Sequence, residues 1–242
     1  MKTKPGFTLI ELIVVIAIIA LLLAIFAPMV TQALEQTRIG LCSVNVERIV
    51  EGAVIYANDN HGAYPRTCRN GVGGGGKDHA SWTSPFVFNF LKSTGMDMMD
   101  FACPNRGVDY IKKQNNRYRV GYYLLFGREE SMAALQYPGQ PKFPTQQTWD
   151  IPERVGDVPT AAMVGDIIEK GTWYTPAGNY ITSVSHGADG LTYGQPGVLE
   201  EPEALGSRGG NVALGNGAVL WRPQSEMVER KVTTDGTVSG YW

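Results

Sequence analysis

The chain of 242 residues has little charge of either sign and almost no excess of one. Lysine and arginine number 21, aspartate and glutamate number 23, and the formal net charge is −2. A chain so close to neutral does not bind nucleic acid through bulk charge. The hydrophobic share of 43% excludes a disordered chain, and the mean hydropathy of −0.13 excludes a protein that crosses a membrane many times.

Cysteine and histidine are also scarce, with three of each. No Cys-x-x-Cys motif and no pair of histidines has the spacing of a zinc site. No serine lies in a Gly-x-Ser-x-Gly motif, and no pair of catalytic carboxylates can be picked out. The sequence therefore predicts no catalytic residue, no metal site and no enzyme.

One long hydrophobic run stands out from this background. Phe7 to Ala27 is 21 residues long, and 19 of these residues are apolar; the exceptions are Thr8 and Glu11. As a helix the run spans roughly 31 Å, close to the hydrocarbon thickness of a bilayer. Lys2 and Lys4 precede it, so the positive-inside rule places the N-terminus in the cytoplasm. We interpret the run as a transmembrane helix.

Two simpler interpretations of the run remain open. A cleaved secretory signal peptide has an apolar region of about 7–15 residues, which is shorter than this one. A plain membrane anchor has no use for Glu11, because an acid within the hydrocarbon costs roughly 2.5–3.5 kcal/mol and is a functional candidate by default. Alternatively, Glu11 reaches the membrane interface, since it is only five residues into the run.

The start of the run carries a family resemblance. Lys4 to Leu12, KPGFTLIEL, resembles the N-terminal signal of type IV pilins and type II secretion pseudopilins. The resemblance implies cleavage between Gly6 and Phe7 by a prepilin peptidase and N-methylation of the new Phe7 amine. Pro28 agrees with it, because pilins often carry a proline just after the apolar stretch.

The same resemblance implies a role in assembly for Glu11. In a growing filament, Glu11 of an incoming subunit could pair with the Phe7 ammonium of its neighbour. Desolvation offsets much of the gain from such a pair, so the pair would set the register more than it would add stability. Glu11 and Pro28 are therefore the predicted assembly residues.

Helical periodicity continues beyond Pro28, where we expect a kink or local melting. Five residues follow spacings of four and three along one helix face, namely Cys42, Val46, Ile49, Ala53 and Tyr56. We expect the helix to end within 58–62, where Asn and Gly residues gather. The predicted organisation is a leader at 1–6, a transmembrane and assembly helix at 7–27, its amphipathic continuation at 28–59, and an extracytoplasmic globular head at 60–242.

The head is predicted to be rich in β-structure, with long loops between the strands. Two short, mainly apolar segments, 211–214 and 218–221, flank the dipeptide Asn216-Gly217, which is a strong signal for the turn of a β-hairpin. The predicted strands are Tyr118–Phe126, Thr160–Val164, Asn179–Ser185, Asn211–Leu214 and Ala218–Trp221. The fold class is therefore α+β and pilin-like, with a long N-terminal helix packed on a small antiparallel sheet.

A second resemblance lies near the C-terminus. His186, together with the segment 210–219, resembles the His…Asp-Gly region of pilin-like proteins from planctomycete-type bacteria. Asn216 stands where that pattern has an aspartate, and His186 lies 30 residues before it. A hairpin turn that needs Asn-Gly geometry also accounts for Asn216 and Gly217.

The cysteines allow one disulfide prediction. Cys42 falls on the core face of the helix and is expected to pack as a small hydrophobic residue. Cys68 and Cys103 lie in predicted loops, and a bridge between them would close a loop of about 35 residues and add roughly 3–4 kcal/mol.

No cofactor is expected, although pseudopilin heads sometimes bind calcium. Asp157, Asp166 and Asp189 are candidate calcium ligands or, alternatively, solvated acids in turns.

Taken together, the residues and the resemblance predict a filament subunit of a type IV pilus or a type II secretion pseudopilus. The implied partners are copies of itself or sister pilins, the prepilin peptidase and an inner-membrane assembly platform, with no nucleic acid. The implied location is the inner membrane, with one span and a periplasmic head, and then a filament at the cell surface. The alternative is a membrane-tethered extracytoplasmic binding module that uses the same signal.

Overall fold

The structure is a computed structural model that divides into two units, Met1–Thr37 and Arg38–Trp242. The residues that it describes are 7–67, 79–114, 116–128, 151–172, 180–188, 190–195, 197–232 and 238–242. The predicted leader at 1–6 lies outside them.

Helix α1, Leu9–Asp59, forms most of the first unit and the start of the second. Between Phe7 and Ile39 the sequence contains no glycine, and the side chains are largely Leu, Ile, Val and Ala. Pro28 lies inside the helix, which continues through it. Of the two expectations at Pro28, a kink or local melting, local melting is wrong, and the kink stays a prediction. Proline costs the helix one backbone hydrogen bond, and the residues on both sides continue the helix with their own backbone bonds.

The end of α1 confirms the prediction from its Asn and Gly residues. His61 and Gly62 have positive φ angles of 56° and 84°, which reverse the direction of the chain. The Gly62 amide donates to the Ala57 carbonyl at 2.7 Å, and Asn60 Nδ2 donates to the Tyr56 carbonyl at 2.8 Å. These bonds satisfy carbonyls that the last turn of a helix leaves open.

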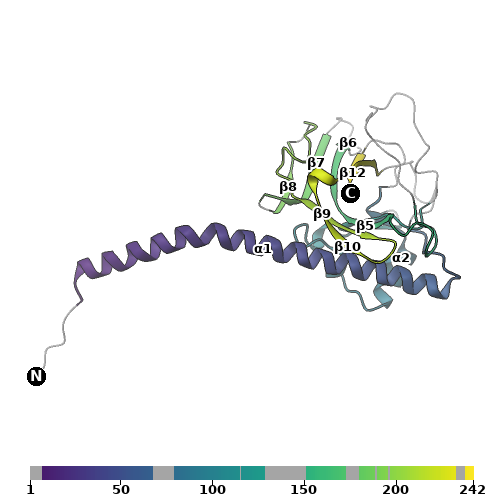
Figure 1. Ribbon diagram of the computed structural model, residues 1–242, viewed down its shortest axis with the longest axis horizontal. Helices are drawn as coiled ribbons and strands as arrows, with labels where there is room; N and C mark the ends of the chain where they lie inside the picture. Colours follow the sequence, from purple (N-terminus) through teal and green to yellow (C-terminus); the bar gives the residue numbers. More distant parts are fainter. Residues whose placement is uncertain are drawn as a thin grey trace, which may run out of the picture. The chain divides into compact units, whose positions relative to one another are not determined.

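Three antiparallel sheets build the rest of the second unit (Figure 1). The four-stranded sheet has the order β10 (Val219–Pro223), β9 (Gly209–Leu214), β5 (Ala162–Asp166) and β4 (Tyr122–Leu124). The five-stranded sheet has the order β11 (Glu229–Lys231), β12 (Val238–Tyr241), β6 (Ile168–Thr172), β7 (Tyr180–Gly187) and β8 (Gly190–Tyr193). The small sheet has the order β1 (Trp82–Thr83), β3 (Arg117–Arg119) and β2 (Lys112–Gln114).

Short helices fill the connections between these strands. Helix α2, Pro85–Ser93, is preceded by its N-cap residue Ser84, whose Oγ accepts a hydrogen bond from the Val87 amide. This is the usual N-cap arrangement, with proline in the first turn. Three 3₁₀ turns complete the described elements, namely η1 (Met99–Phe101), η2 (Val108–Tyr110) and η4 (Gln224–Glu226).

The strand predictions were mostly confirmed. The hairpin of β9 and β10 turns at Asn216-Gly217, where Gly217 has a φ of 85° and Asn216 Oδ1 accepts from the Ala218 amide. Strands β5 and β7 appear close to their predicted places. The α+β class, with one long apolar N-terminal helix and antiparallel sheets, is also confirmed.

The single strand predicted at Tyr118–Phe126 is wrong, because the chain breaks there between β3 and β4. A Cβ on Gly121 would lie 2.6 Å from the backbone nitrogen of Cys103, and the Gly121 amide donates to the Phe101 carbonyl. At this point the chain leaves one sheet and enters the next.

The main core lies between the second part of α1 and the four-stranded sheet. Four of the five residues on the predicted helix face are fully buried, and Tyr56 is half-buried. Against the buried face of α1, buried side chains of α2 and of the four-stranded sheet pack in this core. Its members include Cys42, Val46, Ile49, Ala53, Phe88, Leu91, Phe101, Met163, Val164 and Ala213.

Gly52 marks the closest approach of α1 to α2. A Cβ there would lie 2.5 Å from Leu91 Cδ2, whereas a Cβ on Gly40 would meet none of the described residues within 4 Å. We expect Gly52→Leu to destabilise the protein by about 1–3 kcal/mol through overpacking. The control Gly40→Ala should stabilise it by up to about 1 kcal/mol, because alanine is the better helix former. Urea unfolding of the full chain in detergent measures the free energy of unfolding of each variant. Equal changes in this free energy for Gly52→Leu and Gly40→Ala would contradict the close packing at Gly52.

Candidate functional site

The first turn of α1 is closed by a reciprocal pair, Thr8 and Glu11. Glu11 Oε2 accepts hydrogen bonds from the Thr8 amide at 2.8 Å and from Thr8 Oγ1 at 2.7 Å. In return the Glu11 amide donates to Thr8 Oγ1 at 3.3 Å. This is a capping box, which satisfies amides that the start of a helix leaves open. Glu11 therefore has a local structural role that the sequence analysis missed, although the Thr-x-x-Glu spacing contains it.

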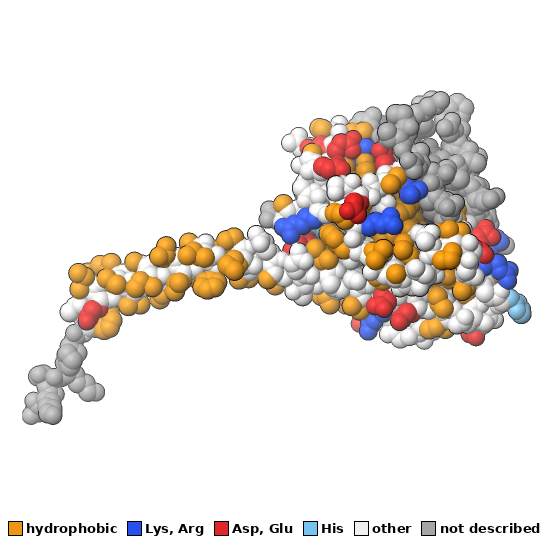
Figure 2. All heavy atoms as spheres, in the orientation of Figure 1, with side chains coloured by type: hydrophobic (Ala, Val, Ile, Leu, Met, Phe, Trp, Pro, Cys, Tyr) orange, Lys and Arg blue, Asp and Glu red, His pale blue; other side chains and the backbone are white. Residues whose placement is uncertain are grey.

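Between Leu12 and Val30 the side chains of α1 are apolar and largely exposed, and Figure 2 shows them along the visible face of the helix. From Leu9 to Phe26 each large hydrophobic residue in the described helix is about half exposed or more, from Val15 at 46% to Leu9 at 76%. By length and composition, α1 is the one helix in the described part of the chain that could cross a membrane. A helix with no polar face needs an apolar environment on every side.

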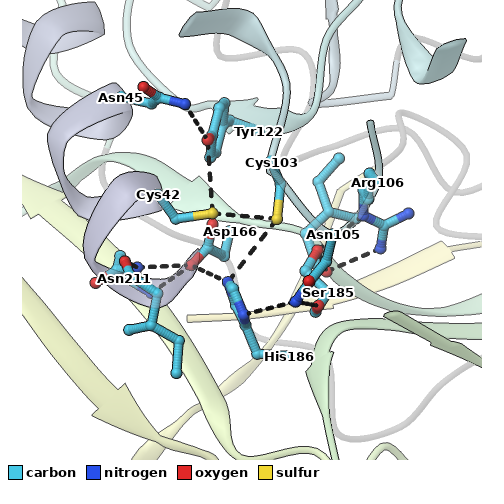
Figure 3. A network of polar contacts seen from close by, with 12 residues as sticks. Cys42, Asn45, Cys103, Asn105, Arg106, Tyr122, Asp166, Ser185, His186 and Asn211 are labelled. Atoms are coloured by element: carbon cyan, nitrogen blue, oxygen red, sulfur yellow. Dashed lines mark hydrogen bonds and ion pairs between the residues drawn. The ribbon is translucent and has the colours of Figure 1, made fainter. Parts of the chain in front are cut away.

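A second group of chemically active side chains lies buried in the second unit (Figure 3). Each member comes from a different element: α1, the loop after η1, the end of β5, and β7. Their ligand atoms all lie within 4.8 Å of one another. We call this group the four-residue cluster; it consists of Cys42, Cys103, Asp166 and His186.

The distances within the cluster are short. Cys42 Sγ lies 3.1 Å from Cys103 Sγ, and His186 Nε2 lies 3.9 Å from Cys103 Sγ. The same Nε2 lies 3.3 Å from Asp166 Oδ2. Both cysteines are free thiols in this arrangement, and all four side chains are buried.

Burial and charge oppose each other in this cluster. Burial by itself lowers the pKa of His186, but the charge of Asp166 and its hydrogen bond outweigh burial and raise the pKa to about 11. Burial by itself raises the pKa of Cys103, but hydrogen bonds from Cys42 and His186 outweigh it and lower the pKa to about 6. Burial raises the pKa of Cys42 well above its usual value, so this thiol keeps its proton.

A ring of further hydrogen bonds holds the cluster in place. Asp166 Oδ2 accepts from the Asn211 amide at 2.7 Å and from Asn211 Nδ2 at 3.1 Å. Asn105 Nδ2 lies 3.2 Å from His186 Nδ1, so Nε2 is the ring nitrogen that faces the sulfurs. The Tyr122 hydroxyl donates to Cys42 Sγ at 3.6 Å.

The cluster has the residue types of a cysteine nucleophile and its base, but not their arrangement. Cys103 and His186 are fully buried, so a substrate has no access to the sulfur. Asp166 contacts Nε2, the same nitrogen that faces the thiol, whereas an orienting acid binds the opposite ring nitrogen. The arrangement therefore suits a structural or ligand-holding role better than nucleophilic catalysis.

The family model of the prokaryotic N-terminal methylation motif matches residues 1–27. The chain carries a prepilin-type signal. Such a signal marks the precursors of type IV pilins and pseudopilins. No curated protein and no solved structure matches the chain.

The prepilin-type signal covers Gly6, Phe7 and Glu11. Gly6 lies outside the described residues, whereas Phe7 is 73% exposed and Glu11 is the N3 residue of the capping box. Pro28 lies one residue beyond the matched segment, within α1. The cleavage and methylation assigned to Gly6 and Phe7 stay predictions.

The remaining sequence predictions fall in several places. Cys68 lies outside the described residues, so its disulfide with Cys103 stays a prediction; the sulfur found beside Cys103 is that of Cys42. Of the calcium candidates, Asp157 accepts from the Arg154 amide in an exposed turn, and Asp166 belongs to the cluster. Asp189 also lies outside the described residues.

Sequence spacing could not have indicated the four-residue cluster. Cys42 was expected to be a small core residue, and it is buried in the core, but its sulfur also meets three polar side chains. His186 was considered together with Asn216, yet Asn216 is exposed in the hairpin turn whereas His186 is fully buried.

A neighbouring buried pair, Glu169 and His79, gives the head a pH dependence. His79 Nε2 lies 3.0 Å from Glu169 Oε2, and Ser183 Oγ donates to Glu169 Oε1. Burial by itself raises the pKa of Glu169, but its contact with His79 and the charges of Arg106 and Arg119 outweigh burial. They lower the pKa from its usual 4.5 to about 2.

We expect this pair to shape acid unfolding. A carboxyl with a lowered pKa stabilises the fold above its unfolded value of 4.5, and this stability is lost as the pH falls towards 2. The contribution is on the order of 3 kcal/mol. In urea unfolding followed from pH 7 to pH 2, Glu169→Gln should flatten the fall in stability below pH 4.5. The control Glu226→Gln, which changes an exposed carboxylate, should leave that fall unchanged. The same fall in unfolding free energy below pH 4.5 for Glu169→Gln and wild type would refute the role given to Glu169.

Proposed function

We propose that this protein is a structural subunit of a filament of the type IV pilus or type II secretion pseudopilus kind. In this proposal the precursor is cut after Gly6, methylated at the Phe7 amine and stored in the inner membrane. Its N-terminus faces the cytoplasm, its head faces the periplasm, and copies of itself or sister pilins join it in the filament. The prepilin peptidase and an inner-membrane platform are its processing and assembly partners.

The observation that carries the proposal is the joining of the prepilin-type signal to an unusually apolar helix. The signal occupies residues 1–27, and α1 continues without a break to Asp59. Between Phe7 and Leu34, Glu11 is the one charged residue. A membrane anchor requires an apolar helix, and a filament core can use the same surface once helices from neighbouring subunits replace the lipid.

The proposal assigns Glu11 two partners at different stages. In the isolated chain its carboxylate closes the capping box with Thr8. In the filament it also faces the Phe7 ammonium of the next subunit. Methylation keeps the charge of that amine. Because the pair sits among apolar side chains, an unpaired Glu11 is costly there, and this cost favours subunits that enter in the correct register.

Processing can be tested on the protein extracted from a strain with an active prepilin peptidase. We expect intact mass and N-terminal sequencing to give a chain that begins at Phe7 and carries one additional methyl group. A Gly6→Val variant should keep Met1–Gly6, because the side chain obstructs the cut site, whereas the control Pro5→Ala should be processed. Retention of the leader in the wild-type chain would contradict the proposed processing.

Assembly can be tested by separating the two roles of Glu11. Glu11→Gln keeps a side chain that can close the capping box but removes the charge. We expect it to be inserted and cleaved normally, with filament incorporation reduced at least about tenfold, as a loss of about 1.4 kcal/mol per contact produces. The matched control Thr8→Ala removes the cap and keeps the charge, so incorporation should stay within about twofold of wild type.

Filament incorporation is measured as the ratio of sheared, pelleted filaments to membrane-bound subunit. Normal incorporation of Glu11→Gln would refute the charge pair. An equal loss in Thr8→Ala would assign Glu11 to helix capping alone. A wild-type chain that is processed but never leaves the membrane fraction, in a strain that assembles filaments, would favour the tethered binding module instead.

A further inference from the structure

The four-residue cluster has the composition of a metal site and a geometry close to one. We propose that these four side chains form a tetrahedral zinc site inside the head. The ligands are Cys42 Sγ, Cys103 Sγ, Asp166 through one carboxylate oxygen, and His186 Nε2 (Figure 3). The proposal concerns the head alone and does not depend on filament formation.

The distances can be compared with those of a tetrahedral zinc ion. Zinc bonds of about 2.3 Å to sulfur place two sulfurs about 3.7 Å apart, and bonds of about 2.0 Å place nitrogen and oxygen about 3.3 Å apart. His186 Nε2 and Asp166 Oδ2 already lie 3.3 Å apart, and Cys103 Sγ lies 3.9 Å from Nε2. The two sulfurs, now 3.1 Å apart, have to separate by roughly 0.6 Å, and Cys103 Sγ has to approach His186 Nε2 by roughly 0.4 Å.

The surroundings are those that a metal site needs. Asn211 donates two hydrogen bonds to Asp166 Oδ2, and Tyr122 donates one to Cys42 Sγ. Among the described residues, the other carboxylate oxygen, Asp166 Oδ1, is buried with no hydrogen-bond partner. A buried acceptor without a donor is costly, and a cation bound to the same carboxylate would offset part of that cost.

One rearrangement accompanies binding at His186. Coordination through Nε2 requires the ring proton to sit on Nδ1, which now faces Asn105 Nδ2 at 3.2 Å. A half-turn of the Asn105 amide brings its oxygen to that proton, at the expense of the bond from Nδ2 to the Ser185 carbonyl. The thiol proton of Cys42 and the proton of His186 Nε2 leave to solvent as the ion enters.

The ligand types select zinc over the other common cations. Two thiolates with an imidazole form a soft to borderline set, whereas calcium and magnesium take oxygen ligands. Full burial leaves no open coordination position for a substrate, which is typical of structural zinc. A disulfide between Cys42 and Cys103 is the competing outcome, but it gives no reason for Asp166 and His186 to converge on the same point.

The proposed ion would connect the parts of the head that carry its ligands. Cys42 belongs to α1, Asp166 to the four-stranded sheet and His186 to the five-stranded sheet. Cys103 lies in the loop after η1. One zinc ion would thus join a helix, a loop and two sheets, in addition to the side-chain packing and hydrogen bonds that already connect them.

The test uses the full chain in detergent, expressed with added zinc and dialysed against metal-free buffer. We expect about one zinc per chain by elemental analysis. The isosteric variants Cys42→Ser and Cys103→Ser should each retain less than about a tenth of that amount, while the control His61→Ala, which removes an exposed histidine, should retain it fully. Circular dichroism shows whether each variant is folded.

A second measurement needs no variant. Replacing zinc with cobalt(II) in the wild-type chain should give the visible bands of tetrahedral cobalt and the thiolate charge-transfer band in the near ultraviolet. Less than about a tenth of a zinc ion per wild-type chain, or cobalt bands without thiolate character, would overturn the proposal. So would peptide mapping without reductant that finds Cys42–Cys103 or Cys68–Cys103 as a disulfide.

Discussion

The fold of the head depends on the second part of α1, which buries one face in the main core. The first part of the same helix is apolar on every face, and its large hydrophobic side chains are exposed. In the second part of α1 the residues from Cys42 to Ala57 direct one face into the main core, where α2 and the four-stranded sheet cover it. In the first part the apolar residues surround the helix completely. The change from all-round to one-sided hydrophobicity along this helix thus separates the part that needs some other apolar environment from the part that packs in the core.

The buried polar groups of the head are arranged around that same helix. Arg106 donates to Ser185 Oγ, Ser183 Oγ and the Ile167 carbonyl, and it lies between the four-residue cluster and the pair of Glu169 with His79. These groups are buried, and charged side chains are kept there only with close partners. The head is therefore specified by polar pairing between its sheets as well as by hydrophobic packing on α1.

The sequence predicted the features that depend on neighbouring residues. The apolar run and its Glu11 indicated the N-terminal signal, and Asn216-Gly217 indicated the hairpin, because each pattern is complete within a short segment. The sequence did not predict the four-residue cluster, whose members are brought together by contacts between distant elements. The break at Gly121 was missed for a similar reason, since the backbone of Cys103 that requires it lies 18 residues away.

Gly210 of β9 sits directly against the carboxylate side of the cluster. A Cβ at this position would lie 2.9 Å from Asp166 Cβ and 3.5 Å from Asp166 Oδ2. Any larger residue would displace the carboxylate from its place beside His186. Position 210 therefore sets the volume that this carboxylate can occupy: glycine leaves room for it beside His186, and a side chain there would take that room away.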